Sequence, residues 1–490
     1  MSAFPSSAVG LPQTMKYDLP PSLPDSARAY SVNVAPDGIT SITGGSLAFG
    51  QYVANVPINA GSFSSQIVSF TIPSGMSDSV FMDPASTTLS FTLTYSIGTA
   101  FAGQAGLSLN LIGSGSSFWD QLVLYSNNTP IETINQYGLL QNFLLQNTVS
   151  LSERNGGISI AMGADTNSAN GIDLGYTGTA GTTFRYNFTI PLLSVIGASS
   201  DKFIPVGSIN NLQLQMTSAN LLPFCSIAST APSAGAITSF TLSEFTLNMK
   251  YVDVGDMAGA LLKQTLQDGK WFIKSQTYTN SAVNIPNGSI GAQQLLLQIR
   301  NTSCKSILHT FGAVQGGLCP NGYYDSINPT LNTRNCQIGG SFYPNKPIND
   351  LARPSEGYPY LIQALAQGGG ITKSYGTVIT KCMYQSCSNA VPSGSDNYWA
   401  TVSNGTRATP TNSDPGDTNA LRFPNSFYCG YDLEKSSGIL FQGVNTRAQP
   451  PFLNLNIVSA TPSTLICQAW GLSDLILQVD TVAKQITAFI

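Results

Sequence analysis

Apolar residues alternate with serine, threonine, asparagine and glutamine along much of the chain, rather than with charged residues. A period of two is typical of strands that bury one face. The predicted strands are clearest at 66–72, 88–95, 107–112, 183–190, 211–217 and 240–254. Turn-forming clusters separate these segments, and this arrangement favours an antiparallel sandwich.

Only three stretches show the three- and four-residue spacing of a helix. The first, 134–147, places Tyr137, Leu140, Phe143 and Leu144 on one side, with Leu145 at its margin. The second, 256–266, carries Met257, Leu261, Leu262 and Leu266 behind a Gly-Asp pair that can cap it. The third, 354–367, ends at Gly368–Gly370. All are short, so the predicted fold is all-β with a few short helices.

The same order of elements occurs twice. In the first half, 118–125 and 130–134 precede a helix, a long irregular loop (156–181) and strands that end at Val254. In the second half, 304–311 and 337–343 precede the helix at 354, a loop (386–424) and strands that end at Phe489. The segment at Asn211 resembles that at Phe452, and the segment at Ser243 resembles that at Ser473. The repetition predicts an extended arm (1–50), a first sandwich (51–255), a linker helix (256–269) and a second sandwich (270–490).

Composition excludes one class of function. Charged residues make up 9% of the chain, with 21 Lys and Arg against 25 Asp and Glu, whereas an average domain carries roughly a quarter. Neutralising phosphates takes clustered cations, so we expect no direct binding to nucleic acid. The hydrophobic content of 42% is enough for a large core, and large neutral contact surfaces would explain the scarcity of charge.

The N-terminus has no basic start followed by an apolar segment, and no run of about 18 apolar residues occurs. We therefore expect folding in a cytosol-like compartment, where cysteines stay thiols. The eight cysteines are Cys225, Cys304, Cys319, Cys336, Cys382, Cys387, Cys429 and Cys467.

Candidate catalytic residues are few. His309 is the single histidine, and its place between Ile307 and Phe311 in a predicted strand favours a hydrogen-bonded structural role. Two carboxylates suffice for glycoside hydrolysis when they are close together. The candidates Asp83, Asp120, Glu132, Glu244 and Asp256 form no local pair, so we interpret them as strand-end or helix-cap residues.

Metal and nucleotide motifs are equally weak. Cys382 and Cys387 are the closest thiol pair, with Cys304, Cys319, Cys336 and Cys429 as further ligands, but zinc sites usually have two closer-spaced pairs. Asp414–Asp417 lacks the spacing of a calcium loop, and Gly368–Gly370 follows a helix instead of preceding one. Glycosylation patterns at Asn187, Asn287, Asn301 and Asn404 are expected by chance in this composition. We predict no catalytic, cofactor-binding or metal-binding residue, no cofactor, and no enzymatic activity.

Several short motifs, taken in order, resemble one family. They are Phe81–Phe91 (FMDPASTTLSF), Phe118–Leu122 (FWDQL), Ile190–Leu193 (IPLL), Lys202–Gly207 (KFIPVG), Cys304–Leu308 (CKSIL) and Tyr343–Ile348 (YPNKPI). Between roughly residues 45 and 490 the chain resembles the double jelly-roll major capsid proteins of icosahedral DNA viruses. This group includes adenovirus hexon and the capsid proteins of tailless phages, polinton-like viruses, virophages and giant viruses.

The resemblance implies two tandem eight-stranded jelly rolls that stand upright, with loops 156–181 and 386–424 outside and helices on the flanks. It implies a homotrimer that forms a pseudo-hexagonal capsomer of the virion, assembled in the host cytoplasm or nucleus. The implied partners are neighbouring capsomers, penton and minor capsid proteins, and an internal membrane reached through the arm at Met1–Tyr30.

Two other functions suit an all-β chain of this kind. A carbohydrate-binding or glycan-processing sandwich would be a monomer with an aromatic-lined groove. An exported surface-layer or adhesion protein would need a secretion route and would carry bridged cysteines.

Overall fold

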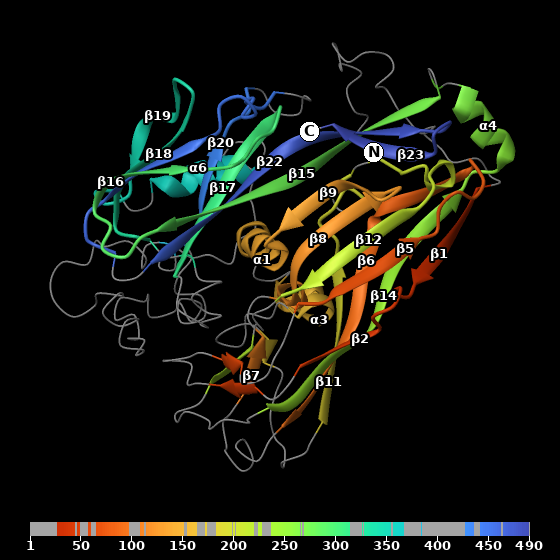
Figure 1. Cartoon of the computed structure of the whole chain (residues 1–490), viewed down its shortest axis with the longest axis horizontal. Coiled ribbons are helices and arrows are strands. Elements are labelled where there is room, and N and C mark those ends of the chain that lie inside the picture. Colours follow the sequence, from red (N-terminus) through yellow and green to blue (C-terminus); the bar gives the residue numbers. More distant parts are fainter. Residues whose placement is uncertain are drawn as a thin grey trace.

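The computed structural model describes two β-sandwiches that lie side by side with one helix between them (Figure 1). It describes residues 27–44, 47–49, 57–59, 65–97, 108–111, 114–150, 154–163, 172–173, 183–197, 199–200, 202–219, 224–227, 237–264, 266, 269–313, 326, 328–353, 356–366, 384, 427–435, 442–461 and 464–489. Within these residues the strands form five antiparallel sheets. The all-β prediction is confirmed.

The first sandwich consists of two four-stranded layers. One layer has the order β1 (Arg28–Val34), β14 (Ile237–Asp253), β6 (Val80–Ile97) and β11 (Thr183–Pro191). The other has the order β5 (Ile67–Ile72), β12 (Leu212–Ser218), β8 (Trp119–Ser126) and β9 (Thr129–Asn135).

The second sandwich has the same construction. One layer has the order β15 (Lys270–Ile285), β22 (Leu465–Asp480), β17 (Cys304–Ala313) and β20 (Cys429–Asp432). The other has the order β16 (Gly291–Leu296), β21 (Phe452–Ile457), β18 (Leu331–Ile338) and β19 (Ser341–Asn349). In both sandwiches the eight strands, counted along the chain, form one sheet in the order 1-8-3-6 and another in the order 2-7-4-5. This is the jelly-roll order, so the chain contains two tandem eight-stranded jelly rolls, as expected.

Additional short strands and helices accompany the two jelly rolls. β2 (Ser41–Gly44) pairs with β14, β3 (Leu47–Phe49) pairs with β14 and with β4 (Pro57–Asn59), and β23 (Gln485–Phe489) pairs with β22. β10 (Ile172–Asp173), β7 (Ser108–Leu111) and β13 (Phe224–Ile227) form a small separate sheet. The helices are η3 (Gly115–Phe118), α1 (Tyr137–Thr148), η4 (Arg154–Ile158), α3 (Ser159–Met162), η5 (Val206–Ser208), α4 (Asp256–Gln264) and α6 (Gly357–Ala366).

The internal repeat is real, but part of its predicted alignment is wrong. β12 does correspond to β21, and β14 to β22. The counterpart of β8 is β18, with the same order of buried and half-buried residues along the strand. Segment 304–311 lies in β17, the counterpart of β6. Segment 337–343 is not one strand either, because Gly339, at φ +60°, turns the chain between β18 and β19.

Two segments expected to be irregular contain regular structure. β1 lies inside the predicted arm (1–50), yet it pairs with β14 from Arg28↔Asp253 to Val34↔Leu247. The predicted loop 156–181 contains the helical turns of η4 and α3 and the short strand β10. Residues 1–26 and loop 386–424 lie outside the described residues.

The helices differ from the one-sided pattern expected of them. Helix α1 is buried on nearly every side, because residues of the second jelly roll pack against Phe143. Helix α4 instead exposes two of its apolar residues, with Met257 at 83% and Leu261 at 59% exposed. It approaches the body through Gly259, where a Cβ atom would lie 2.9 Å from Ser79.

Aromatic rings fill the core of the first jelly roll. Phe91 lies edge-to-face with Phe118 and Trp119, at ring-centroid distances of 5.9 and 5.6 Å, and stacks on Phe188 at 5.2 Å. Such pairs contribute about 0.5–1.5 kcal/mol each beyond their buried area. These contacts join strands β6 and β11 to β8, which lies in the opposite layer.

Candidate functional site

The five carboxylates considered from sequence lie on five different elements. Asp83 is in β6, Asp120 in β8, Glu132 in β9, Glu244 in β14, and Asp256 opens α4. Asp83 accepts a hydrogen bond from the backbone N of Ala85 at 3.2 Å, and Asp256 accepts one from Ser77 Oγ at 3.2 Å. Burial raises the pKa of Asp120. Asp256 lies at the start of its helix, close to the predicted cap position, whereas Asp83 lies within β6 and not at its end. The surroundings of Glu132 are different again.

Glu132 is buried between the two jelly rolls, neither at a strand end nor at a helix cap. Its carboxylate accepts hydrogen bonds from Ser194 Oγ at 2.5 Å and from the backbone N of Val195 at 2.9 Å, both in the first roll. It also accepts one from Thr277 Oγ1 of β15, in the second roll, at 2.9 Å. Burial raises the pKa of Glu132 to about 7, against the lowering effect of these three hydrogen bonds.

Helix α1 forms the apolar part of the same junction. The Phe143 ring lies 4.7 Å from Tyr428 and 6.1 Å from Trp470, measured between centroids. Tyr428 Oη donates to Gln146 Oε1 at 2.7 Å, and Trp470 Nε1 donates to the carbonyl oxygen of Asn135 at 3.4 Å. The first roll thus contributes β9 and α1, and the second contributes β15, β22 and Tyr428, the residue before β20.

Further contacts extend the junction on both sides. Phe81 packs edge-on against Trp271 at 6.1 Å, and Ser200 Oγ lies 2.9 Å from Ser275 Oγ. Near the C-terminus, the backbone N of Ile486 donates to Ser126 Oγ at 3.0 Å. In Figure 1 the long β15–β22 ladder and β23 extend over the first jelly roll. The two rolls therefore share a buried, bonded interface.

The single histidine lies in the core of the second jelly roll. His309 is fully buried, stacks on Tyr431 at 5.5 Å and meets Phe311 edge-on at 5.1 Å. Neither ring nitrogen has a hydrogen-bond partner among the described residues, so packing replaces the hydrogen bond expected from sequence. Burial, helped by the nearby Arg334 charge, lowers the pKa of His309 far below its usual value.

Arg334 is a buried cation of this core and was not considered from sequence. Its Nε donates to Asp350 Oδ2 at 2.7 Å, and both side chains are fully buried. The guanidinium also lies over the rings of Phe427 and Tyr431, at 5.5 and 5.8 Å. In β18 it stands in a run of polar residues, between Thr333 and Asn335, so no sequence signal separates it from a surface cation.

Four cysteines are free, buried thiols: Cys304, Cys336, Cys429 and Cys467. Burial raises the pKa of Cys304 and Cys429 to about 12, and it raises that of Cys336 and Cys467 further. The expectation of thiols is confirmed for these four. No group of three or more His, Cys, Asp or Glu side chains that could hold a metal ion occurs in the part of the chain that the structure describes.

Other sequence candidates lie on structural positions or outside the described residues. Asn301 is buried and accepts a hydrogen bond from Thr279 Oγ1 at 3.1 Å, which leaves no room for a glycan. Cys319, Cys382, Cys387, Asn404, Gly368–Gly370 and Asp414–Asp417 lie outside the described residues. None of the helices in the described ranges combines the length and hydropathy needed to cross a membrane.

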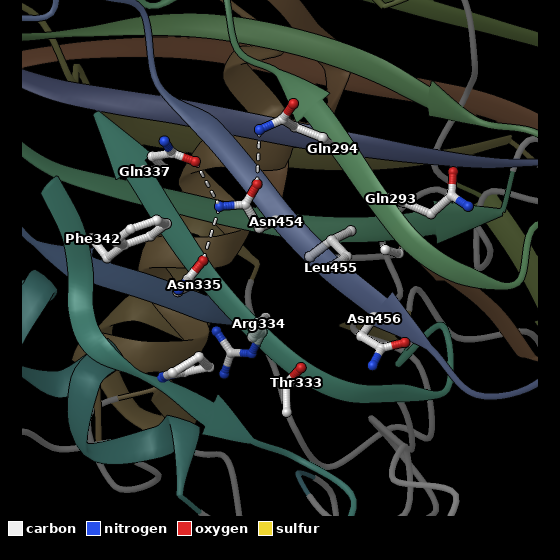
Figure 2. A pocket seen from close by; sticks show the side chains of 12 residues that line it. Gln293, Gln294, Thr333, Arg334, Asn335, Gln337, Phe342, Asn454, Leu455 and Asn456 are labelled. Carbon is white, nitrogen blue, oxygen red and sulfur yellow. Dashed lines mark hydrogen bonds between the residues drawn. The ribbon is translucent and has the colours of Figure 1, made fainter. Parts of the chain in front are cut away.

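A shallow groove of about 430 Å³ lies on β16, β21, β18 and β19 of the second jelly roll, and carboxamides line it (Figure 2). Gln294 Nε2 donates to Asn454 Oδ1 at 3.0 Å, and Asn454 Nδ2 donates to Asn335 Oδ1 at 3.0 Å and to Gln337 Oε1 at 3.3 Å. Because these groups bond to one another, the groove does not support the carbohydrate-binding alternative. It shows how this surface stays polar with few charges.

The fold defines the class of protein that this chain resembles. No family model and no curated protein matches the sequence. A chain of the Sputnik virophage structure determined by cryo-EM is 11% identical, with a TM-score of 0.54 over 100% of this chain and 93% of that one. A chain of the PBCV-1 virus capsid is 11% identical, with a TM-score of 0.50 over 96% and 97%.

A third structure adds a named capsid component. The Faustovirus major capsid protein is 9% identical, with a TM-score of 0.50 over 94% of this chain and 92% of that one. At such identities the similarity establishes the fold. The chain has the double jelly-roll architecture of viral capsid proteins, as the sequence motifs indicated.

Proposed function

We propose that this chain is a major capsid protein, and that three copies form a pseudo-hexagonal capsomer of an icosahedral virion. One observation carries the proposal: the match to capsid structures covers both jelly rolls and nearly the full length of both chains. A single shared jelly roll would be weak support, because that fold serves many functions. Two rolls in tandem, with few residues left over on either side, are much more specific.

The physical character of the chain suits a building block. The buried junction at Glu132 and Phe143 holds the two rolls as one rigid unit with two similar lobes. Three such units make six similar lobes, which tile like a hexagon. Interfaces of this kind bury thousands of Å², and neutral carboxamide and hydroxyl faces avoid the cost of desolvating charges there.

The strands support one set of domain boundaries. We propose that the first jelly roll begins at β1 rather than after residue 50 and ends at Asp253, with α4 as the linker and β15 as the first strand of the second roll. The arm that reaches neighbouring capsomers, penton and minor capsid proteins or an internal membrane would then be residues 1–26.

We further propose that the protein acts in the virion without catalysis and without direct contact to the genome. The buried His309 and the self-bonded carboxamides support a structural role. With 21 cations against 25 anions, the chain cannot neutralise packaged nucleic acid, so another layer would lie between shell and genome. Assembly would take place in the host cytoplasm or nucleus.

Light scattering during size-exclusion chromatography tests the proposal on purified protein. We expect a particle of about 155 kDa, three times 51.7 kDa, that persists at high salt because the interface is mostly uncharged. A monomer that stays monomeric at micromolar concentration would overturn the trimer.

A further inference from the structure

One lysine and two acidic side chains are buried together in the second jelly roll. The side chains of Lys305, Glu434 and Asp474 are 3%, 2% and 0% exposed. Lys305 Nζ lies 2.9 Å from Glu434 Oε1 and 3.8 Å from Asp474 Oδ1. Removing ions from water is costly, and when all three groups are ionised they retain one negative charge. Stability alone is therefore a weak explanation for the cluster, and the described residues form no metal site here.

A β-bulge places Lys305 in this cluster. The pairing of β17 with β22 shifts register between Cys304 and Ser306, so Lys305 is the extra residue of the bulge. Bulges redirect a side chain relative to the regular alternation of a strand. The carbonyl oxygen of Lys305 accepts a hydrogen bond from the backbone N of Leu433 at 2.8 Å, and this bond holds the next residue, Glu434, beside the lysine.

The third group, Asp474, is fixed by Ser303. Ser303 Oγ donates to Asp474 Oδ2 at 2.8 Å, and the backbone N of Asp474 donates to the carbonyl oxygen of Ser303 at 3.1 Å. Gly443 covers the site closely, because its backbone N donates to Ser303 Oγ at 3.2 Å and a Cβ atom there would overlap the backbone of Cys304. One carboxylate oxygen is thus held by a hydroxyl, and the other lies beside the amine.

We propose that Lys305 and Asp474 become joined by an intramolecular isopeptide bond, with Glu434 as the proton carrier. The Nζ–Cγ bond forms and the Cγ–Oδ1 bond breaks. Lys305 begins as an ammonium with three protons on Nζ and ends as an amide with one. The other two protons pass through Glu434 to Oδ1, which leaves as water, so Glu434 ends ionised as it began. One positive and one negative charge disappear together, and no oxidant, reductant or second molecule takes part.

The geometry suits each step of this reaction. Glu434 Oε1 is within hydrogen-bond distance of Nζ, and removal of a proton makes the amine a nucleophile. The Ser303 hydroxyl lies on Oδ2, where negative charge develops when the amine adds to the carboxyl carbon. The protein holds both reactants in one buried place, which replaces a bimolecular encounter. Exclusion of water protects the amide from hydrolysis, and a neutral amide replaces a buried ion pair.

The bond would connect β17 to β22, the third and eighth strands of the second jelly roll, at the centre of their sheet. It would close residues 305–474 into a covalent loop, which restricts the unfolded chain as a disulfide does, but without depending on redox conditions. The reaction occurs once in each molecule, without turnover, so it is compatible with a structural protein. It does not depend on the number of copies in the capsomer.

Mass spectrometry of the purified full chain under denaturing conditions tests the bond. We expect the protein to be lighter than its sequence by one water. Trypsin does not cleave after an amidated lysine, so the digest should contain peptide 301–334, uncut at Lys305, joined to peptide 448–484, which holds Asp474. A chain of full sequence mass, with normal cleavage after Lys305, would overturn the proposal.

Two conservative variants test the chemistry in chains that should still fold. Glu434→Gln keeps both reacting groups, leaves one buried cation against one anion, and cannot carry the protons, so it should keep its full sequence mass. Asp474→Asn should form the same amide by losing ammonia instead of water, so its final mass should equal that of the linked parent chain. Full linkage in Glu434→Gln would refute the role of Glu434, and an unlinked Asp474→Asn chain would contradict the reaction.

An exposed pair provides the internal control. Lys263 Nζ lies 2.6 Å from Asp78 Oδ2, but both side chains are exposed to water, at 47% and 41%. We expect no linked peptide from this pair in the same digest, because hydration keeps both groups charged and no third residue there is assigned to carry the protons. A Lys263–Asp78 link as abundant as the Lys305–Asp474 link would show that proximity alone is enough, against the mechanism proposed for the buried site.

Discussion

The carboxylate of Glu132 in the first jelly roll accepts a hydrogen bond from Thr277 Oγ1 in the second, at 2.9 Å. No cation pairs with this carboxylate among the described residues, and its partners are two hydroxyls and one backbone N–H. The junction therefore contains a buried acid whose pKa burial raises to about 7. Its charge state changes within the ordinary range of cellular pH.

The first prediction concerns pH. The pKa of Glu132 is about 7 in the folded chain and near 4.5 in the unfolded chain, so protonation of this carboxyl stabilises the fold. The stabilisation is complete below pH 4.5 and is lost as pH rises through about 7. We expect Glu132→Gln to become more stable relative to the unmodified protein between pH 5 and pH 8. The difference between their melting temperatures should grow over this range, and the change corresponds to up to about 3 kcal/mol of unfolding free energy. The exposed carboxylate variant Glu244→Gln is the matched control. Parallel pH curves for Glu132→Gln and the unmodified protein would contradict the assignment.

The second prediction concerns the apolar part of the junction. Phe143 is fully buried between Tyr428 and Trp470, so Phe143→Ala leaves a cavity between the rolls and costs about 3–5 kcal/mol of unfolding free energy. Urea denaturation measures this loss. Met257→Ala, at an 83% exposed position of α4, is expected to stay within about 0.5 kcal/mol. Equal effects of the two substitutions would refute the packing of α1 against the second roll.

The third prediction concerns the buried ion pair. Arg334→Met leaves the Asp350 carboxylate buried without its partner, and we expect a loss of about 3–5 kcal/mol. The double variant Arg334→Met with Asp350→Leu removes both charges and should be more stable than Arg334→Met alone. A double-mutant cycle in urea checks this, and simple additivity of the two substitutions would be inconsistent with a coupled pair.

The fourth prediction concerns the thiols. Burial raises the pKa of Cys304 and Cys429 to about 12, so neither forms a reactive thiolate at pH 8. Iodoacetamide should leave these two and Cys336 and Cys467 unmodified in the folded protein, and modify all four in guanidinium. Peptide mass spectrometry reads each site separately. Rapid labelling of Cys304 in the folded protein would contradict its place in the core.

Local alternation was enough to predict much of the β structure. Leu212–Ser218 and Phe452–Ile457 each alternate apolar and polar residues, and both are the seventh strand of a jelly roll. β1 also alternates Tyr30, Val32 and Val34 with small polar residues, but the Pro- and Ser-rich segment before it favoured an extended arm. Its strand status depends on pairing with β14, more than 200 positions away in the chain.

Contacts between the jelly rolls could not be predicted in the same way. The Glu132 side chain is buried only because β15 of the second roll lies beside it, and nothing in the local sequence encodes that neighbour. The same holds for α1, whose second buried face exists because Tyr428 and Trp470 cover it. The spacing of apolar residues in a helix or strand indicates which face packs against one neighbour. It does not indicate whether a second neighbour covers the opposite face.

The central claim is that each chain supplies two equivalent lobes to a three-copy ring. Electron microscopy of the purified protein tests it most directly. Class averages viewed down the symmetry axis should show six lobes of similar size with threefold symmetry. Isolated two-lobed particles, or rings with any other number of chains, would contradict the account.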